Sequence, residues 1–231
     1  MYGEAVALRM WDGRGAVRLL AHDPRRHAML LQRCEPGDQL AASAGPVEET
    51  LRAGCAVLRQ LWQVAPPAAG AIEDLAVVTA EWADLVEERM VRIRPGYDPG
   101  LIAEGTRLLR ELPSSAVCRV LLHGDFNPSN VLSCGAGLWA AIDPKPMIGD
   151  PAYDPWPLLE QLDDPFAYAD RVAVLRSRLD LMSGECSLDT QRITLWAVAR
   201  LVETALWAAD QGDVIAGADA VQQARVLLGL S

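Results

Sequence analysis

The stretch Val120–Asp154 constrains the fold of this 231-residue chain more than any other part of the sequence. It combines short apolar segments with polar loops, a pattern that predicts short buried strands. The expected strands are Val117–Leu122, a segment through Val131 and Leu132, and Leu138–Ile142. Two acids, Asp125 and Asp143, follow the first and the third of these strands. Because a carboxylate is costly to remove from water, two converging acids usually have a partner, either a metal ion or a protonated substrate group.

The loop after the first strand has the spacing His-x-Asp-x-x-x-x-Asn, formed by His123, Asp125 and Asn130. This is the spacing of the kinase catalytic loop, in which the Asp accepts the proton of the attacking hydroxyl and the Asn binds Mg²⁺. Asp143 lies thirteen residues beyond Asn130, where such a site has its second magnesium ligand. The competing interpretation is a strand–loop–strand unit whose Asp and Asn side chains only form turns.

Two segments, HGDFNPSNVL and IDPKPMIGDPAYD, extend this pattern. Together they resemble the aminoglycoside and hydroxyurea antibiotic-resistance kinases, most closely the streptomycin phosphotransferase branch. The resemblance implies an α+β, protein-kinase-like fold of the aminoglycoside phosphotransferase type, with a partial small lobe and a mainly helical large lobe. Residues 1–37 would be a remnant of the nucleotide-binding small lobe and its hinge, and residues 38–231 the helical large lobe with the catalytic loop. The cofactors implied are ATP and Mg²⁺.

The resemblance also assigns roles near the N-terminus. Glu4 would match the helix glutamate that pairs with a phosphate-binding lysine. The backbone of the expected cofactor-binding residues Arg33, Cys34 and Glu35 would meet adenine. Without the resemblance, Glu4 is a solvated helix residue and the expected hinge is an ordinary loop.

The sequence departs from the resembled pattern ahead of Glu4, because only three residues precede it. No glycine-rich phosphate loop and no lysine-bearing strand stand there, and Lys145 is the only lysine in the sequence. Since those groups normally cradle and neutralise the phosphates, we expect that the chain starts late, through truncation or a misassigned start. Activity of such a shortened chain would be impaired. The alternative to an active enzyme is therefore a truncated, inactive kinase-like binding protein.

The catalytic set expected in this loop is Asp125, His123 and Asn127. Asp125 is the expected base or hydroxyl-orienting acid, and its main contribution would be alignment of the acceptor. His123 is expected to stabilise the loop through its ring hydrogen bonds more than to titrate. Asn127 either orients the loop or touches the substrate. Lys145, assigned to the cofactor, either reaches the transferred phosphate or forms a structural ion pair.

Two further acids, Asp150 and Asp154, are expected to support the site. Gly149-Asp150-Pro151 predicts a turn, and Asp154 would cap a helix at Trp156. Either acid could brace the catalytic loop by accepting hydrogen bonds from its backbone N–H groups.

Most of the remaining chain is predicted to be helical, because its apolar residues recur at helical spacing. Two strands joined by a polar loop are expected near the N-terminus. The expected strands are Ala16–Ala21 and Ala28–Cys34, and the expected helices are Tyr2–Trp11, Val47–Trp62, Ile72–Met90, Asp98–Leu112, Trp156–Leu162, Phe166–Met182, Leu188–Ala209 and Val214–Leu228. The helix from Leu188 carries apolar residues around its axis, which predicts burial on most sides.

Acids outnumber bases by 31 to 21, so the formal net charge is -10. This charge disfavours nucleic-acid partners and favours a cationic small molecule. By the resemblance, the γ-phosphate of ATP would move to a hydroxyl of an aminoglycoside-type, streptomycin-like antibiotic, and the second possibility is a kinase for another small alcohol. Acids of the later helices either bind the cationic groups of such an acceptor or form solvated helix faces. These acids are Glu160, Asp163, Asp164, Glu203 and Asp210.

Five cysteines, an odd number without closely spaced pairs, indicate reduced thiols. Glu4 and Arg9 lie where a secretory signal would need an apolar core. Arg200 and Glu203 interrupt the apolar run Leu195–Ala209, so no membrane span is expected. The sequence therefore predicts a cytoplasmic protein without a membrane partner, and it leaves the oligomeric state open.

Overall fold

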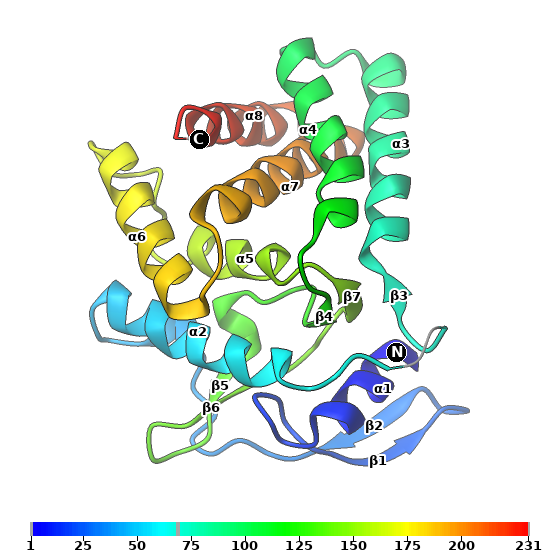
Figure 1. Cartoon of the computed structure of the whole chain (residues 1–231), viewed down its shortest axis with the longest axis vertical. Helices are drawn as coiled ribbons and strands as arrows, with labels where there is room; N and C mark the ends of the chain where they lie inside the picture. The colour runs from blue at the N-terminus through cyan, green and yellow to red at the C-terminus, as the bar shows by residue number, and fades with distance from the viewer. Residues whose placement is uncertain (1, 68–69, 231) are drawn as a thin grey trace.

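The N-terminal elements lie together beside the short central strands, in a computed structural model that describes residues 2–67 and 70–230. Figure 1 shows helix α1 (Tyr2–Trp11) and strands β1 (Leu19–Asp23) and β2 (Ala28–Leu31) at the bottom of the view. The fully buried Trp11 joins α1 to the next helix, because its indole N–H donates to the backbone oxygen of Leu61 at 3.2 Å.

The two N-terminal strands are shorter than predicted. They pair antiparallel, and their register begins at Leu19 opposite Leu31. The expected start at Ala16 is wrong, because residue 16 forms a bridge with Ala141 and the Val17 N–H donates to the Ala141 oxygen at 3.1 Å. The segment before β1 is therefore attached to the central strands.

The strands expected around the catalytic loop are confirmed as β4, β5 and β6, each three residues long. β4 begins later than predicted, and Val117 at its expected start is 99% exposed. Two further short strands, β3 and β7, were not predicted. One sheet has the order β3-β7-β4, in which β7 is parallel to β3 and antiparallel to β4. In a second sheet, β5 pairs antiparallel with β6. Their bounds are β3 Glu73–Asp74, β4 Val120–Leu122, β5 Val131–Ser133, β6 Trp139–Ala141 and β7 Met147–Gly149.

The rest of the described chain is mainly helical, and α7 lies in the middle of it (Figure 1). α7 packs against α3, α4, α5, α6 and α8, which confirms its predicted burial on most sides. The helices are α2 Val47–Trp62, α3 Leu75–Ile93, α4 Pro99–Glu111, α5 Pro155–Glu160, α6 Arg171–Cys186, α7 Thr190–Asp210 and α8 Val214–Leu228. None of the helices in residues 2–67 and 70–230 is long and apolar enough to cross a membrane.

Aspartate side chains set where five of these helices begin. Each accepts a hydrogen bond from a backbone N–H of the first turn, which satisfies a donor that has no partner within the helix. The capping residues of α3, α4, α6, α7 and α8 are Asp74, Asp98, Asp170, Asp189 and Asp213. Three predicted starts are corrected. α3 begins at Leu75 because residues 73–74 pair with β7, and α6 begins at Arg171, after a turn that Asp164 stabilises. α7 begins at Thr190, after its cap Asp189, and not at Leu188.

Candidate active site

The loop after β4 turns sharply at Gly124, whose φ is +82°. A Cβ atom added to Gly124 would collide with the backbone oxygen of Lys145. The same two segments are joined by a hydrogen bond from the Lys145 N–H to the His123 oxygen, 2.8 Å long. The loop can follow this path only with glycine at position 124, because other residues disfavour positive φ and no side chain fits there.

Asp125 is held by two amide side chains from its own loop. The Asn127 Nδ2 group donates to Asp125 Oδ1 at 3.2 Å, and the Asn130 Nδ2 group lies 3.4 Å from Asp125 Oδ2. Asn127 Oδ1 in turn accepts from the backbone N–H groups of Ser129 and Asn130, which caps the short helix Pro128–Asn130. Asn127 therefore orients the loop, and Asp125 reaches the wall of a cavity of about 1190 Å³.

Asn130 and Asp143 are brought together by the pairing of β5 with β6. The Ile142 N–H donates to the Asn130 oxygen at 2.9 Å, so Asp143 follows directly after this contact. Asp143 has a φ of +53°, a conformation that costs free energy in a residue other than glycine and is often found at functional sites. Its Oδ1 atom lies 2.8 Å from the ammonium nitrogen of Lys145.

Asn130 and Asp143 offer an amide oxygen and a carboxylate, the chemical type of ligand that a magnesium ion prefers. The Asn130 amide nitrogen is used by Asp125, and among the described residues no hydrogen bond goes to its oxygen. Asp143 Oδ2 is likewise without a hydrogen-bond partner in the described part of the chain. No cluster of three or more His, Cys, Asp or Glu side chains in that part could hold a metal. Mg²⁺ prefers oxygen ligands and usually takes only one or two carboxylates, so further ligands would come from phosphate and water.

His123 lies beneath the loop and does not line the cavity. Its Nε2 atom lies 3.0 Å from the Ile142 oxygen, and its Nδ1 atom accepts from the Asp125 N–H at 3.3 Å, which places the ring proton on Nε2. The ring stacks on Trp11 and meets Phe126 edge to face. Burial lowers the pKa of His123, so the neutral ring is favoured. His123 is therefore buried, bonded at both ring nitrogens and turned away from the cavity.

Asp154 accepts hydrogen bonds from the catalytic loop itself. Its carboxylate accepts from the backbone N–H of His123 at 3.0 Å, from that of Gly124 at 2.9 Å and from the Trp62 indole at 3.1 Å. Burial raises the pKa of this fully buried group, and these donors oppose the rise. The helix cap predicted for Asp154 is wrong, because its side chain makes no bond to the first turn of α5.

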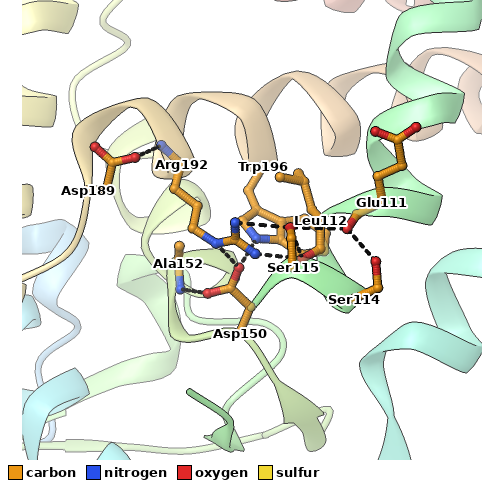
Figure 2. A network of polar contacts seen from close by, with 9 residues as sticks. All are labelled: Glu111, Leu112, Ser114, Ser115, Asp150, Ala152, Asp189, Arg192 and Trp196. Carbon is orange, nitrogen blue, oxygen red and sulfur yellow. Dashed lines mark hydrogen bonds and ion pairs between the residues drawn. The ribbon is translucent and has the colours of Figure 1, made fainter. Parts of the chain in front are cut away.

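Asp150 connects the turn before Asp154 to α7 and, through Arg192, to the end of α4 (Figure 2). Its Oδ2 atom accepts from Arg192 Nε at 2.5 Å and from the Trp196 indole at 2.7 Å, while Oδ1 accepts from the Ala152 N–H at 3.1 Å. Figure 2 shows the Arg192 guanidinium extending further, to the Leu112 oxygen and the Ser115 hydroxyl at the end of α4. The predicted turn is present, and the contacts of Asp150 run to α7 instead of the catalytic loop.

The expected adenine-contacting residues lie where the chain passes β5. Cys34 is buried and its sulfur lies 2.9 Å from that of Cys134, both being free thiols. Arg33 and Glu35 are exposed and form an ion pair at 3.4 Å. None of residues 33–35 is among the described residues that line the large cavity, whereas Glu4 and Lys145 are.

The acids proposed to bind cationic groups of the acceptor lie elsewhere. None of Glu160, Asp163, Asp164, Glu203 and Asp210 is among the described residues lining the cavity. Three of these acids are already paired with arginines, namely Asp163 with Arg178, Glu203 with Arg89, and Asp210 with Arg89 and Arg92. Of the two alternatives, acceptor binding at this cavity is therefore not supported for these five acids. Besides Asp125, the cavity is lined by Glu73, Trp82, Tyr153 and Arg200, which the sequence did not single out for this site.

Comparison with known proteins finds a matching family model and related kinases. The family model described as aminoglycoside/hydroxyurea antibiotic resistance kinase matches residues 2–212. A streptomycin 6-kinase from Streptomyces glaucescens is 34% identical over 225 residues, which are 97% of this chain and 72% of that protein. A hydroxyurea phosphotransferase from Kitasatospora aureofaciens is 36% identical over an alignment of 231 positions, which covers 98% of this chain and 64% of that protein.

Solved structures are similar in fold. The choline kinase LicA from Streptococcus pneumoniae superposes with a TM-score of 0.68 at 18% identity, covering 98% of this chain and 80% of that one. An aminoglycoside phosphotransferase in ternary complex with AMP-PNP and hygromycin B gives a TM-score of 0.63 at 16% identity, covering 99% and 82%. These likenesses confirm the expected α+β, protein-kinase-like fold, with its mainly helical larger part.

Proposed function

The chain belongs to the aminoglycoside/hydroxyurea antibiotic resistance kinase family, and on this premise we propose that it transfers the γ-phosphate of ATP to a hydroxyl group of a small-molecule antibiotic. One observation carries the proposal most directly. Asp125 is fixed at the wall of the large cavity by two amide side chains, and the backbone that carries Asp143 is bonded to Asn130 and His123 on either side.

Asp125 would orient the acceptor hydroxyl and receive its proton. The bonds from Asn127 and Asn130 fix the carboxylate, so little orientational freedom is lost when the acceptor binds. Because phosphoryl transfer passes through a loose transition state, alignment of the hydroxyl contributes more than proton removal does. His123 and Asp154 act behind the loop, by fixing the backbone on which Asp125 stands.

Asn130 and Asp143 would hold Mg²⁺ through the oxygen atoms that have no other bond in the described chain. A bound Mg²⁺ would neutralise charge on the phosphate groups of the nucleotide. Lys145, now paired with Asp143, lines the cavity and supplies a second positive charge beside the expected phosphates. Glu4 also lines this cavity. Its pKa is raised mainly by burial and to a smaller extent by the negative charge of Asp143.

Adenine binding by the backbone of residues 33–35 remains a proposal, as does the division into a nucleotide-binding part (1–37) and a helical part (38–231). The support for both is the family and the kinase-like fold. For the acceptor, we propose first a streptomycin-like aminoglycoside, because a streptomycin 6-kinase is among the relatives. Hydroxyurea is the second candidate, because a hydroxyurea phosphotransferase is 36% identical.

The test is phosphate transfer by the full 231-residue chain. The chain is incubated with ATP, Mg²⁺ and either streptomycin or hydroxyurea, and the phosphorylated acceptor is measured by mass spectrometry. We expect product from the wild type and at least about a hundredfold less from Asp125→Asn, which keeps the size of the side chain and removes the charge. Asp219→Asn, an exposed position on α8, is the matched control and should leave the rate unchanged. Equal rates for Asp125→Asn and wild type would refute the role of Asp125, and an inactive wild type would favour the kinase-like binding protein.

A further inference from the structure

Arg200 lines the cavity wall, and most of its guanidinium N–H donors have no hydrogen-bond partner among the described residues. It extends from α7 over the ring of Tyr153, with its guanidinium carbon 4.4 Å from the ring centre. One of its nitrogens donates to the Tyr153 oxygen at a long 3.5 Å. No carboxylate within residues 2–67 and 70–230 forms an ion pair with Arg200, although it lines the same cavity as Asp125.

The other cations of the cavity wall are neutralised by direct contacts. Arg119 forms an ion pair with Asp74, and Lys145 forms one with Asp143 at 2.8 Å. Glu160 and Glu203 are close enough to Arg200 for its charge to oppose the rise that burial causes in their pKa values. These two acids stabilise the positive charge of Arg200 from a distance and leave its N–H groups unused.

The position of Arg200 is fixed by a rigid platform. Tyr153 is 1% exposed, its ring meets Trp196 edge to face at 5.2 Å, and Trp82 lies tilted at 6.5 Å. A guanidinium stacked on an aromatic ring keeps its N–H donors in its own plane, where they can bond to a ligand. The cavity that Asp125 lines therefore also presents the charged N–H donors of Arg200, held in place over Tyr153.

Glu73 places a negatively charged side chain on the cavity lining. It is an exposed residue of the edge strand β3, and it forms no ion pair with any described residue. β7 separates β3 from β4, the strand that leads to Asp125, so the two outer strands lie roughly 10 Å apart. An acceptor that spans this distance would meet a negative group at one end and a positive group at the other.

We propose that Arg200 is a specificity-determining residue of the acceptor site. It donates hydrogen bonds to oxygen atoms in an uncharged part of the acceptor, next to the hydroxyl that Asp125 orients. Its charge keeps cationic groups of the acceptor away from this wall, and such groups lie toward Glu73. The assignment rests on the proposed function, because it requires that the acceptor occupies the cavity beside Asp125.

The test measures acceptor binding to the full chain by calorimetry without nucleotide, using streptomycin as a cationic probe and hydroxyurea as an uncharged one. Arg200→Met should weaken binding of both probes at least about tenfold, since charge-assisted hydrogen bonds are lost. Arg200→Lys keeps the charge and loses the planar fork, so it should also weaken both probes. Glu73→Gln should weaken streptomycin alone. Arg176→Met, which removes the same charge from an exposed position of α6, is the matched control and should change neither affinity.

Several results would overturn the assignment. They are unchanged binding in both Arg200 variants, tighter binding of streptomycin by Arg200→Met, or no binding of either probe by the wild type. Thermal unfolding of each variant separates a folding defect from a binding defect, and Arg200→Lys keeps a positive charge at this position if Arg200→Met does not fold. A wild type that binds both probes and transfers no phosphate would contradict the proposed function alone, while the binding data would still decide the role of Arg200.

Discussion

Gly124 makes the catalytic loop possible through the absence of a side chain. Its positive φ and the closeness of the Lys145 oxygen leave no room for a Cβ atom. We expect Gly124→Ala to lower the free energy of unfolding by at least about 2 kcal/mol and to lower phosphate transfer at least about a hundredfold, because backbone atoms must move. Denaturant unfolding and the transfer assay measure the two effects.

Gly137→Ala is the matched control for this prediction. Gly137 also has a positive φ, of +74°, but an added Cβ atom would meet nothing within 4 Å. This variant should show only the cost of the backbone conformation, about 1 kcal/mol, with normal transfer. If both variants lost activity equally, the close approach of Gly124 to Lys145 would not be the reason.

At the scale of residues, the sequence placed Asp125 in its loop and named His123 and Asp154 as supports, and both contact the loop backbone. It did not predict the distant side chains that hold the supporting acids. Asp125, Asn127 and Asn130 belong to one loop, so a local pattern is enough to find them. Trp62 and Arg192 contact Asp154 and Asp150 across 92 and 42 residues of sequence. A tryptophan or arginine on an amphipathic helix carries no local signal of such a distant partner, which is why the sequence did not single out either.

At the scale of elements, Asp150 joins the turn before α5 to α7 and to the end of α4 (Figure 2). The side chain of Asp150 is 4% exposed and that of Arg192 is 20% exposed. Asp150→Ala leaves Arg192 without its carboxylate and the Trp196 indole without an acceptor. We therefore expect the free energy of unfolding to fall by about 3 kcal/mol or more, measured by denaturant unfolding.

The exposed ion pair between Asp84 and Arg110 provides the comparison. Asp84 is 77% exposed in its side chain, so Asp84→Ala should cost about 1 kcal/mol or less. A similar loss in both variants would show that burial of the Asp150 pair contributes nothing special. A loss for Asp150→Ala below that for Asp84→Ala would contradict the anchoring role.

Helices were easier to predict than strands, for a physical reason. A helix such as α8 repeats its apolar spacing over 15 residues and its predicted bounds are confirmed. β3 and β7 have two and three residues, and their pairing is set by contacts far along the chain. The start of β1 was wrong for the same reason, because residues 16 and 17 bond to Ala141.

At the scale of the whole molecule, the fold followed from a family resemblance carried by two short segments, and periodicity alone would not have specified it. The acceptor cavity was not predictable in this way. Its lining includes residues of α1, α3, α7, β3 and β7 and of the loops after β4 and β6, so its charges come together only in the folded chain. The acids of the later helices, which the sequence left as either acceptor ligands or solvated faces, do not line it, and arginines pair with three of them.

In the proposed enzyme, Asn130, Asp143 and Asp125 form one centre, with a divalent ion on the first two. Mn²⁺, which shares the oxygen preference of Mg²⁺, can be added with ATP to the isotope-labelled chain while backbone amide signals are followed by NMR. We predict that the signals of Asn130, Asp143 and Asp125 broaden together at the lowest Mn²⁺ concentrations, and that Asp143→Asn removes the effect. Broadening centred on another part of the chain, or unchanged broadening in Asp143→Asn, would contradict the account.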